Sequence, residues 1–316
     1  MITVGLDLGG TNIRAAALGE EGSLHSVHKE RLVDKAPEKV LRSVAALVEA
    51  VADDARGSTE SISALCVALA GQLNHPRGLV AIGPNLGWVD VPFREMLASV
   101  FSFPVRVEND LSAAAWGERV AGAGKGADHL ALVAVGSGVG AGIIEDGKLL
   151  TGACGLAAEI GHTKVVRGGE QCGCGELGCL EAYTGGHRMA LRALRLWEEA
   201  GLERPMGLAQ ESITMETVHE AFENGDAVAR RVIEEAGEHL GLAVANLVTL
   251  LNPSTLVLGG GVLLGVPYLS EKIRNDVAAL TAAPARRSVN IEFASLGDDA
   301  GLVGAGHLAR EIAKKR

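Results

Sequence analysis

The sequence predicts an α/β protein of two duplicated lobes, and three observations lead to this prediction. Short apolar runs typical of strands alternate along the 316-residue chain with stretches whose apolar residues recur at helical spacing. The chain is also longer than the roughly 250–300 residues at which a single core stops growing. Finally, an apolar strand, a small-residue turn with one hydroxyl and a second apolar strand occur twice, at residues 4–18 and 130–144. Two copies of one unit indicate a duplicated domain.

The first half of the chain begins with a strand, a glycine turn and a second strand. Val40, Val44 and Val51 mark an amphipathic helix, and the almost wholly apolar run at 62–71 is typical of a buried parallel strand. The expected elements are strands at 2–7, 13–18 and 27–33, a helix at 37–55, a strand at 62–71, a loop at 72–90, a helix at 92–100, a strand at 104–110 and a helix at 111–121.

The second half repeats the alternation of strands and helices. Its expected elements are two strands within 130–144, helical stretches at 181–200 and 214–251, a strand at 254–261, a helix at 267–280, a strand at 289–296 and a closing helix at 300–314. We expect residues 1–111 to form the N-terminal lobe, with the C-terminal helix of residues 300–316 packing back on it. Residues 112–299 are expected to form the second lobe, with a metal loop and a nucleotide site.

Charge and hydropathy exclude several kinds of partner. The chain has 29 basic and 39 acidic residues, a net charge of −10, and no basic stripe. Nucleic acid and anionic membranes are therefore not expected as partners. No apolar run reaches the length of a membrane span, and the strand that follows Met1 leaves no room for a signal peptide. The cytoplasm is the expected compartment.

Residues 155–182 include four side chains of the types that commonly bind metal ions: His162, Cys172, Cys174 and Cys179. One imidazole and three thiolates complete a tetrahedral zinc site without water, which favours a structural ion over a catalytic one. A glycine-rich loop with reduced cysteines is the alternative. A disulfide is disfavoured, because Cys172 and Cys174 are too close in sequence to pair easily and nothing marks secretion.

Three glycine clusters follow predicted strands and are candidate phosphate or nucleotide sites. The first lies in a hairpin and therefore lacks the strand-to-helix context of a dinucleotide-binding fingerprint or a Walker loop. Backbone N–H groups of such turns can nevertheless bind phosphate oxygens, and Asp7 can hold Mg²⁺ through water. A tight turn without function is the alternative for the first cluster alone. The candidates are Asp7, Gly9, Gly10, Thr11 and Asn12, then Gly136, Ser137, Gly138 and Gly140, then Gly259, Gly260 and Gly261.

Carboxylates at two further places suit phosphoryl transfer to a sugar. Asp110 closes the run Glu108-Asn109-Asp110 and is a candidate general base, although Asn109 or Asp110 is equally suited to cap a helix. Glu159 and Glu181 flank the metal loop, either as solvated charges or as rigidly placed acceptors for sugar hydroxyls.

These motifs together resemble the ROK family of repressors, open reading frames and kinases. The resemblance extends over nearly the whole chain, and the pair EIGH and CGCGELGCLE is its most specific part. The matching motifs are DLGGTN at 7–12, PNLGW at 84–88, END at 108–110, GSGVGAG at 136–142, EIGH at 159–162, CGCGELGCLE at 172–181, LGGGV at 258–262 and AGLVGAG at 300–306.

The resemblance implies an actin-like ATPase fold of the hexokinase type, with ATP and sugar in the cleft between two duplicated lobes. It implies that Asp110 deprotonates the primary hydroxyl of a hexose. The residues that it implies for sugar binding are Gly71, Asn85, Asn109, Asp110, Glu159, His162 and Glu181, with His162 also a zinc ligand. The three glycine clusters would hold ATP, with Gly259 to Gly261 beside the adenosine, and Mg²⁺ and structural Zn²⁺ would complete the site.

The expected activity is that of an ATP-dependent hexose kinase, most specifically a glucokinase that forms homodimers or homotetramers. Kinases for N-acetylmannosamine, N-acetylglucosamine or fructose would use the same residues. Three further hypotheses are polyphosphate as the donor, a sugar sensor without turnover and a purely structural zinc protein. Family repressors carry a DNA-binding segment before the first hairpin, whereas only six residues precede Asp7. Ala70-Gly71 stands where many members have Pro-Gly, which leaves the fit beside the sugar open.

Overall fold

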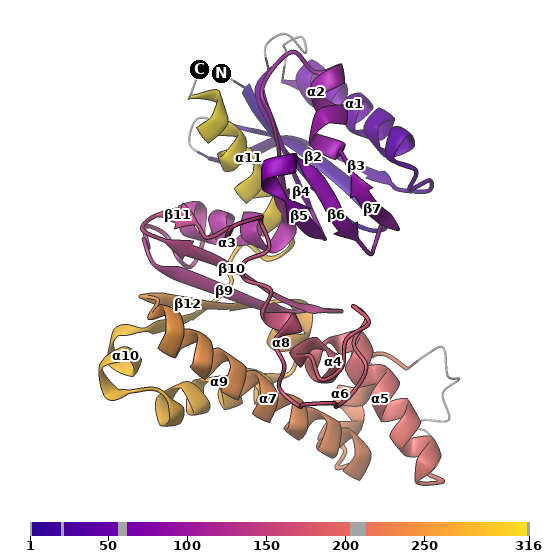
Figure 1. The fold of residues 1–316 in the computed structure, drawn as a ribbon, viewed down its shortest axis with the longest axis vertical. Coiled ribbons are helices and arrows are strands. Elements are labelled where there is room, and N and C mark those ends of the chain that lie inside the picture. The colour runs from indigo at the N-terminus through magenta and orange to yellow at the C-terminus, as the bar shows by residue number, and fades with distance from the viewer. Residues whose placement is uncertain (1, 20–21, 56–61, 203–212, 315–316) are drawn as a thin grey trace. The chain divides into compact units, whose positions relative to one another are not determined.

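The computed structural model describes residues 2–19, 22–55, 62–202 and 213–314 (Figure 1). Strands and helices alternate along the chain, as predicted. The strands are β1 (Ile2–Leu8), β2 (Asn12–Leu18), β3 (Leu24–Arg31), β4 (Ile62–Leu69), β5 (Gln72–Asn74), β6 (Leu79–Gly83), β7 (Trp88–Val91), β8 (Val105–Asn109), β9 (Leu130–Val135), β10 (Val139–Glu145), β11 (Lys148–Leu149), β12 (Thr255–Gly259) and β13 (Asn290–Phe293).

Helices fill most of the remaining chain. The α-helices are α1 (Pro37–Asp54), α2 (Phe93–Val100), α3 (Asp110–Ala121), α4 (Leu180–Thr184), α5 (Gly186–Glu199), α6 (Met215–Glu223), α7 (Ala227–Leu251), α8 (Gly261–Gly265), α9 (Pro267–Leu280), α10 (Ala283–Ser288) and α11 (Ala300–Ala313). Short 3₁₀ turns are η2 (His75–Arg77), η3 (Ile160–His162) and η6 (Gly297–Asp299). The last two residues of the C-terminal segment predicted to pack on the first lobe lie outside the described residues.

The first sheet has the strand order β3-β2-β1-β4-β8. β1, β2 and β3 pair antiparallel, whereas β4 pairs parallel with both β1 and β8. Helix α11 packs against β1 and β4 (Figure 1). Gly5 allows this close approach, because a Cβ there would lie 2.5 Å from main-chain atoms of Leu302 and Gly306. The C-terminal helix thus completes the core around the first strand.

The second sheet repeats the strand order of the first. Its order is β11-β10-β9-β12-β13, again three successive strands followed by two that arrive later in the chain. β10 and β11 pair antiparallel, and β12 and β13 pair parallel, as do β4 and β8 at the corresponding positions of the first sheet. The weak repeat between residues 4–18 and 130–144 therefore coincides with β1–β2 and β9–β10, and the predicted duplication is confirmed.

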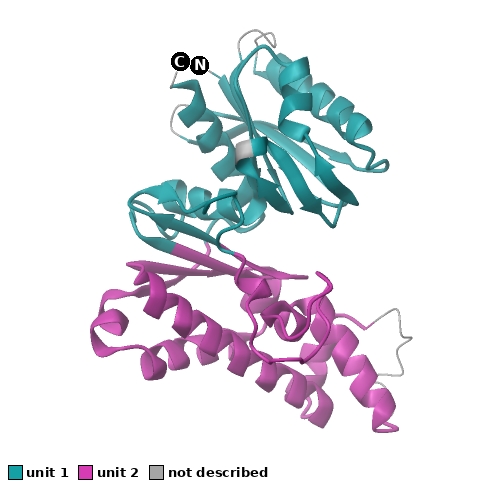
Figure 2. Cartoon of the chain, viewed as in Figure 1, with its two compact units in different colours: residues 1–130, 142–158, 295–316 teal, residues 131–141, 159–294 magenta. Residues whose placement is uncertain are grey.

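The chain divides into two compact units (Figure 2). Unit 1 comprises Met1–Leu130, Gly142–Ala158 and Ser295–Arg316, and unit 2 comprises Ala131–Ala141 and Glu159–Ala294. Residues 112–130 and 142–158 thus belong to unit 1, although we expected them in the second lobe. The functional lobe boundary near residue 111 stays a prediction.

One expectation about secondary structure is wrong, and two predicted helical stretches are helical but interrupted. Residues 72–90 form the small antiparallel sheet β5-β6-β7 in place of a loop, because Leu73, Val80 and Trp88 are buried among the turn-forming residues. The helical stretch at 181–200 breaks at Gly185 into α4 and α5. The stretch at 214–251 breaks before Asp226, whose side chain accepts a hydrogen bond from the Ala229 N–H at 2.8 Å and caps α7.

The buried faces follow the predicted periodicity. Val40, Val44 and Val51 of α1 are fully buried, and Cys66 lies in the core of β4 as a small apolar residue. Among the described residues, no helix is both long and apolar enough to cross a membrane.

Candidate active site

Asn109 and Asp110 lie where the last strand of the first sheet meets a helix. The Asn109 side chain is the N-cap of α3, since its Oδ1 accepts hydrogen bonds from the N–H groups of Leu111 and Ser112, both at 3.0 Å. Its Nδ2 donates to the Gly71 carbonyl at 3.1 Å. The structure thus joins two predicted sugar ligands, and it shows that the capping interpretation holds for Asn109.

Gly71 has a steric reason to be glycine. A Cβ at this position would lie 2.7 Å from the Ile82 carbonyl oxygen, which belongs to β6. Gly10 is similarly close to Asn85, because a Cβ on Gly10 would meet the Asn85 Cβ at 3.0 Å. The Lys35 Nζ donates to the Asn85 carbonyl at 2.8 Å and supports the loop that carries it. Predicted sugar and phosphate residues are therefore neighbours within unit 1.

Asp110 and Asp7 form a pair of poorly neutralised carboxylates in unit 1. Burial raises the pKa of Asp110, against the hydrogen bond that its Oδ1 accepts from the Leu111 N–H at 2.9 Å. Burial also raises the pKa of Asp7 to about 6, and the Asp110 carboxylate adds to this effect. Two carboxylates in such surroundings favour a bound proton or a nearby divalent cation.

Arg14 is a residue of this region that the sequence analysis missed. It pairs with Asp7 across the β1–β2 hairpin, and its charge lowers the pKa of Asp7. Its Nη1 donates to the Asp298 carbonyl at 2.9 Å, and its Nη2 is hydrogen-bonded to the Asp299 carboxylate. The hairpin register would have placed Arg14 opposite Asp7, but nothing in the sequence indicates the contact with Asp298.

The first glycine turn is a tight hairpin, as predicted. The Gly9 N–H donates to the Asn12 carbonyl at 2.9 Å, and Thr11 stands exposed at the tip of the turn. Asp7 lies just before the turn in β1, and Asn12 begins β2. The turn therefore presents a hydroxyl and main-chain groups beside Asp7, within unit 1.

The other two glycine clusters come together within unit 2. Gly260 has φ = 88°, and a Cβ there would lie 2.4 Å from the Val135 carbonyl oxygen, immediately before the turn that starts at Gly136. Gly259 ends β12 and Gly261 begins α8. The N–H groups of Gly186 and His187 donate to the carbonyls of Gly136 and Ser137, at 2.9 and 3.2 Å. The start of α5 is thus a third part of this glycine-rich region, which the predicted helical stretch at 181–200 did not single out.

Glu181 connects the metal loop to the second glycine turn. Its Oε2 accepts a hydrogen bond from the Val139 N–H at 3.0 Å, and a Cβ on Gly138 would lie 2.6 Å from the same oxygen. Its Oε1 is 3.6 Å from the Cys172 Sγ. Gly140, the last predicted residue of that turn, lies within β10. Glu181 is therefore a partly buried, hydrogen-bonded carboxylate and not a solvated surface charge.

His162, Cys172, Cys174 and Cys179 form one cluster, as predicted for a zinc site. One ligand atom from each lies within 4.8 Å of the others. The His162 Nδ1 is 3.8 Å from the Cys172 Sγ, and the Cys174 and Cys179 Sγ atoms are also 3.8 Å apart. Zn–S bonds of about 2.3 Å in a tetrahedron separate two sulfur atoms by about 3.8 Å. The donor set and its spacing fit zinc.

Glu159 lies beside the second ring nitrogen of His162. Its Oε2 is 3.7 Å from the His162 Nε2 across the 3₁₀ turn η3, which confirms that the two side chains face the same way. The Lys164 Nζ donates to the Cys179 Sγ at 2.9 Å. Gly178 has φ = 76°, and a Cβ there would lie 1.7 Å from the Val166 carbonyl oxygen, so only glycine fits this point of the loop.

The family of this chain follows from its similarity to known proteins. The model of the ROK family matches residues 3–312, so the chain belongs to the ROK family. A glucokinase of Streptomyces coelicolor is 36% identical over 98% of both chains. An N-acetylmannosamine kinase of Yersinia pseudotuberculosis is 34% identical and covers 96% of this chain and 97% of its own length.

A solved structure gives the same assignment in three dimensions. The ROK family glucokinase from Streptomyces griseus in complex with glucose and AMPPNP has a TM-score of 0.77 and 34% identity, and the match covers 98% of this chain and all of that one. The actin-like ATPase fold with its two duplicated lobes is therefore confirmed, in agreement with the repeated strand order of the two sheets.

Proposed function

We propose that this chain is a hexose kinase that transfers the γ-phosphoryl group of ATP to the primary hydroxyl of glucose. Membership of the ROK family and the similarity to glucokinases support this activity. The single structural observation that carries it is the pair of Asp110 and Asp7, in which burial raises the pKa of both carboxyl groups. A general base and a cation-binding carboxylate are the two charged groups that phosphoryl transfer requires of the protein.

Asp110 acts as the general base. Its carboxylate takes the proton of the primary hydroxyl while the hydroxyl oxygen attacks the γ-phosphorus. The bond from that phosphorus to the bridging oxygen breaks, and ADP leaves with the electron pair. Asp7 is the residue that would hold Mg²⁺, through water, and the ion would neutralise phosphate charge. A raised pKa suits Asp110 for this role, because proton transfer is efficient when the pKa of the base approaches the working pH.

The remaining site residues divide between sugar and nucleotide. We assign the sugar hydroxyls to Gly71, Asn85, Asn109, Glu159, His162 and Glu181. We assign the phosphates to the turns at residues 9–12 and 136–140, and the adenosine to residues 259–261. Support comes from the contacts that join members of each set within one unit, such as Asn109 with Gly71 and Gly260 with Val135.

We further propose a structural zinc ion held by His162, Cys172, Cys174 and Cys179. When bound, the ion would supply a rigid cross-link and no reacting group, because its four ligands leave no open position. The loop residues would then keep Glu159 and Glu181 in place for the sugar. Support comes from the spacing of the four donor atoms and from the lysine ammonium beside the Cys179 sulfur.

Phosphorylation of an N-acetylated hexose is the second candidate. It is supported by the N-acetylmannosamine kinase, whose 34% identity nearly equals that of the glucokinase. The two activities differ in the space required at the second carbon of the sugar. Fructose kinase activity and polyphosphate as donor are further outcomes that one assay can separate.

The test is an ADP-release assay with Mg²⁺ and either ATP or polyphosphate. Glucose, mannose, fructose, N-acetylglucosamine and N-acetylmannosamine are compared by kcat/KM, with sugar phosphate measured when polyphosphate is the donor. Highest kcat/KM for glucose with ATP supports the proposal. A higher kcat/KM for an N-acetyl sugar supports the second candidate, phosphorylation of an N-acetylated hexose. Absence of turnover with every pair, in protein that binds sugar, would contradict a kinase and support a sensor.

We also propose that the enzyme is a cytoplasmic homodimer or homotetramer. Its acidic composition and its use of ATP and free sugar support the compartment, and membership of the family supports self-association. Light scattering behind a sizing column measures the assembly, and a mass of about 33 kDa at micromolar concentration would contradict it.

A further inference from the structure

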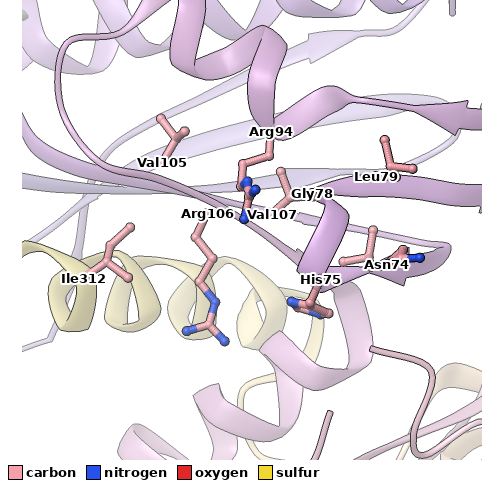
Figure 3. A pocket seen from close by; sticks show the side chains of 10 residues that line it. Asn74, His75, Gly78, Leu79, Arg94, Val105, Arg106, Val107 and Ile312 are labelled. Carbon is pink, nitrogen blue, oxygen red and sulfur yellow. The ribbon is translucent and has the colours of Figure 1, made fainter. Parts of the chain in front are cut away.

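A cavity lies along β8, the edge strand of the first sheet (Figure 3). Its volume is about 220 Å³. β5, η2, α2, β8 and α11 all contribute residues, and every one of them belongs to unit 1. Nothing in the proposed reaction uses this cavity, although β8 ends at Asn109.

The walls of the cavity combine apolar side chains with polar ones that carry nitrogen atoms. Val105 and Ile312 form part of the apolar lining, while Arg94, Arg106 and His75 contribute nitrogen atoms (Figure 3). This combination is typical of sites for small anionic molecules, because apolar contacts bury the carbon skeleton and a few charged groups fix its orientation. At 220 Å³ the cavity is smaller than the roughly 300–1,000 Å³ of ordinary ligand pockets. Its ligand must therefore be smaller than a nucleotide.

Arg94, in the first turn of α2, is the second arginine of this cavity. Within the described part of the chain, no carboxylate forms an ion pair with it. Its guanidinium packs over Gly78, where a Cβ would lie 2.6 Å from the Arg94 Nε and where φ is 65°. The glycine thus gives the guanidinium room beside the main chain.

Arg106 and His75 line the cavity and also contact a buried carboxylate. Glu108 is 1% exposed, and its Oε2 accepts from the Arg106 Nη2 at 2.5 Å. Its Oε1 is 3.2 Å from the His75 Nε2 and accepts from the Asn109 N–H at 3.0 Å. Glu311 of α11 contributes a further negative charge near Arg106. Arg106 is therefore largely neutralised, which leaves Arg94 as the main attraction for an anion.

We propose that this cavity binds a small phosphate-bearing metabolite and that its occupancy weakens sugar binding at the Asn109–Asp110 junction. Arginine binds phosphate through paired hydrogen bonds, and a phosphate near Arg106 and His75 competes with Glu108 for their donors. The Glu108 carboxylate also accepts a hydrogen bond from the N–H of Asn109, which is the N-cap of α3. A change in the other hydrogen-bond partners of Glu108 therefore alters the position of Asn109. The binding half of this proposal is independent of the proposed kinase activity, whereas the regulatory half rests on it.

Binding is tested by calorimetry on the full chain without nucleotide, with inorganic phosphate and glucose 6-phosphate as separate probes. We expect Arg94→Gln to weaken binding at least about tenfold and Arg94→Lys to retain part of it. Arg77→Gln is the matched control, because Arg77 is exposed on the same turn as His75 but does not line the cavity. Circular dichroism melting verifies that each variant is folded.

The outcomes separate the sources of affinity. Binding of both probes assigns recognition to the phosphate group, and binding of the ester alone assigns part of it to the sugar skeleton. Both support the cavity only if Arg94→Gln reduces them more than Arg77→Gln does. Equal binding by Arg94→Gln and parent protein, equal losses in the two variants, or no binding of either probe overturns the proposal.

Regulation is tested by measuring the KM for the sugar with and without the bound probe. The probe here is inorganic phosphate, because glucose 6-phosphate is the product of the proposed reaction and would compete with the sugar in every variant. We expect phosphate to raise KM in the parent and in Arg77→Gln, and to leave it unchanged in Arg94→Gln, whose turnover without probe equals that of the parent. Binding without any change in KM would remove the regulatory half and retain the site. If the parent protein shows no turnover even without probe, the kinase assignment is contradicted, and calorimetry still tests whether the cavity binds phosphate.

Discussion

The two halves of the proposed sugar site are held in place by different means. Asn109 and Asp110 lie at the end of a paired strand and the start of a helix, where main-chain hydrogen bonds fix their positions. Glu159 and Glu181 instead flank an irregular loop at which the side chains of His162 and the three cysteines converge. Regular secondary structure positions a side chain without a ligand, whereas a loop of this kind needs a cross-link.

Both regions also gather side chains that can bind a cation. In unit 1 the groups are the Asp7 and Asp110 carboxylates, which are hard oxygen ligands suited to Mg²⁺. In unit 2 they are cysteine thiols and an imidazole, a donor set that suits zinc once the thiols lose their protons. We therefore expect the metal loop to lose its conformation without zinc, whereas the β8–α3 junction keeps its geometry.

The largest expected effect is that of Asp110→Asn. The amide keeps the shape of the side chain but cannot take a proton, so we expect kcat to fall by about 10³-fold with little change in sugar affinity. Single-turnover kinetics and sugar titration measure the two quantities. Asp90→Asn, at an exposed position in β7, makes the same chemical change and should keep parental kcat. A kcat near that of the parent in Asp110→Asn would remove Asp110 as the base.

Removal of a zinc ligand should affect binding more than turnover. We expect Cys174→Ala to lose its zinc and to raise the KM for sugar by about tenfold or more, since an unsupported loop no longer holds Glu159 and Glu181. Elemental analysis measures the metal. Cys154→Ala, a cysteine outside the cluster, should keep one zinc per chain. Equal zinc content in Cys174→Ala and the parent would contradict the ligand assignment.

The carboxylate pair predicts a dependence of stability on pH. Burial and the Asp110 carboxylate raise the pKa of Asp7 to about 6, against the effect of Arg14, whereas in the unfolded chain it is about 4. The folded state therefore holds the proton more tightly, and stability is lost as pH rises from about 4 to above 6. At about 1.4 kcal/mol per pH unit between these values, the loss is about 3 kcal/mol.

Asp7→Asn tests this dependence, because the amide carries no charge at any of these pH values. We expect it to raise the free energy of unfolding by about 2–3 kcal/mol at pH 7.5 without Mg²⁺, and by nearly nothing at pH 4. Urea denaturation at both pH values measures the difference. Asp53→Asn, at an exposed position in α1, should show no such dependence. A gain of the same size at both pH values would disprove the raised pKa.

The smallest expected effect concerns the support of α3. Glu118 is fully buried, and its carboxylate accepts hydrogen bonds from the N–H groups of Ala123, Ser295 and Leu296, at 2.7, 2.9 and 2.9 Å. In Glu118→Gln the amide nitrogen faces one of these donors. We expect the free energy of unfolding to fall by about 1–3 kcal/mol while zinc content stays unchanged.

Chemical denaturation and elemental analysis together check the Glu118 prediction. Glu95→Gln serves as the control, because Glu95 is exposed in the first turn of α2. Loss of zinc in Glu118→Gln would show that the stability of α3 and that of the metal loop depend on each other, which would contradict the prediction.

Much of the local structure follows from the sequence. The apolar runs of β1 and β4 and the periodicity of α1 predict their elements because burial requires apolar residues at those intervals. The three strands within residues 72–90 do not follow, since each is short and surrounded by Asn, Pro and Gly. Their burial depends on Leu73, Val80 and Trp88 meeting in three dimensions.

The sequence by itself determined the candidate residues: the metal-binding set, the Asp110 candidate and the glycine turns were singled out by residue type and by their places beside predicted strands. Only the tertiary structure decided that Gly260 lies against Val135, that Glu181 is held by the Val139 N–H, and that Arg14 reaches Asp298. These contacts join residues far apart in the chain. Spacing constrains only neighbours along the chain, whereas the approach of distant segments depends on how whole elements pack.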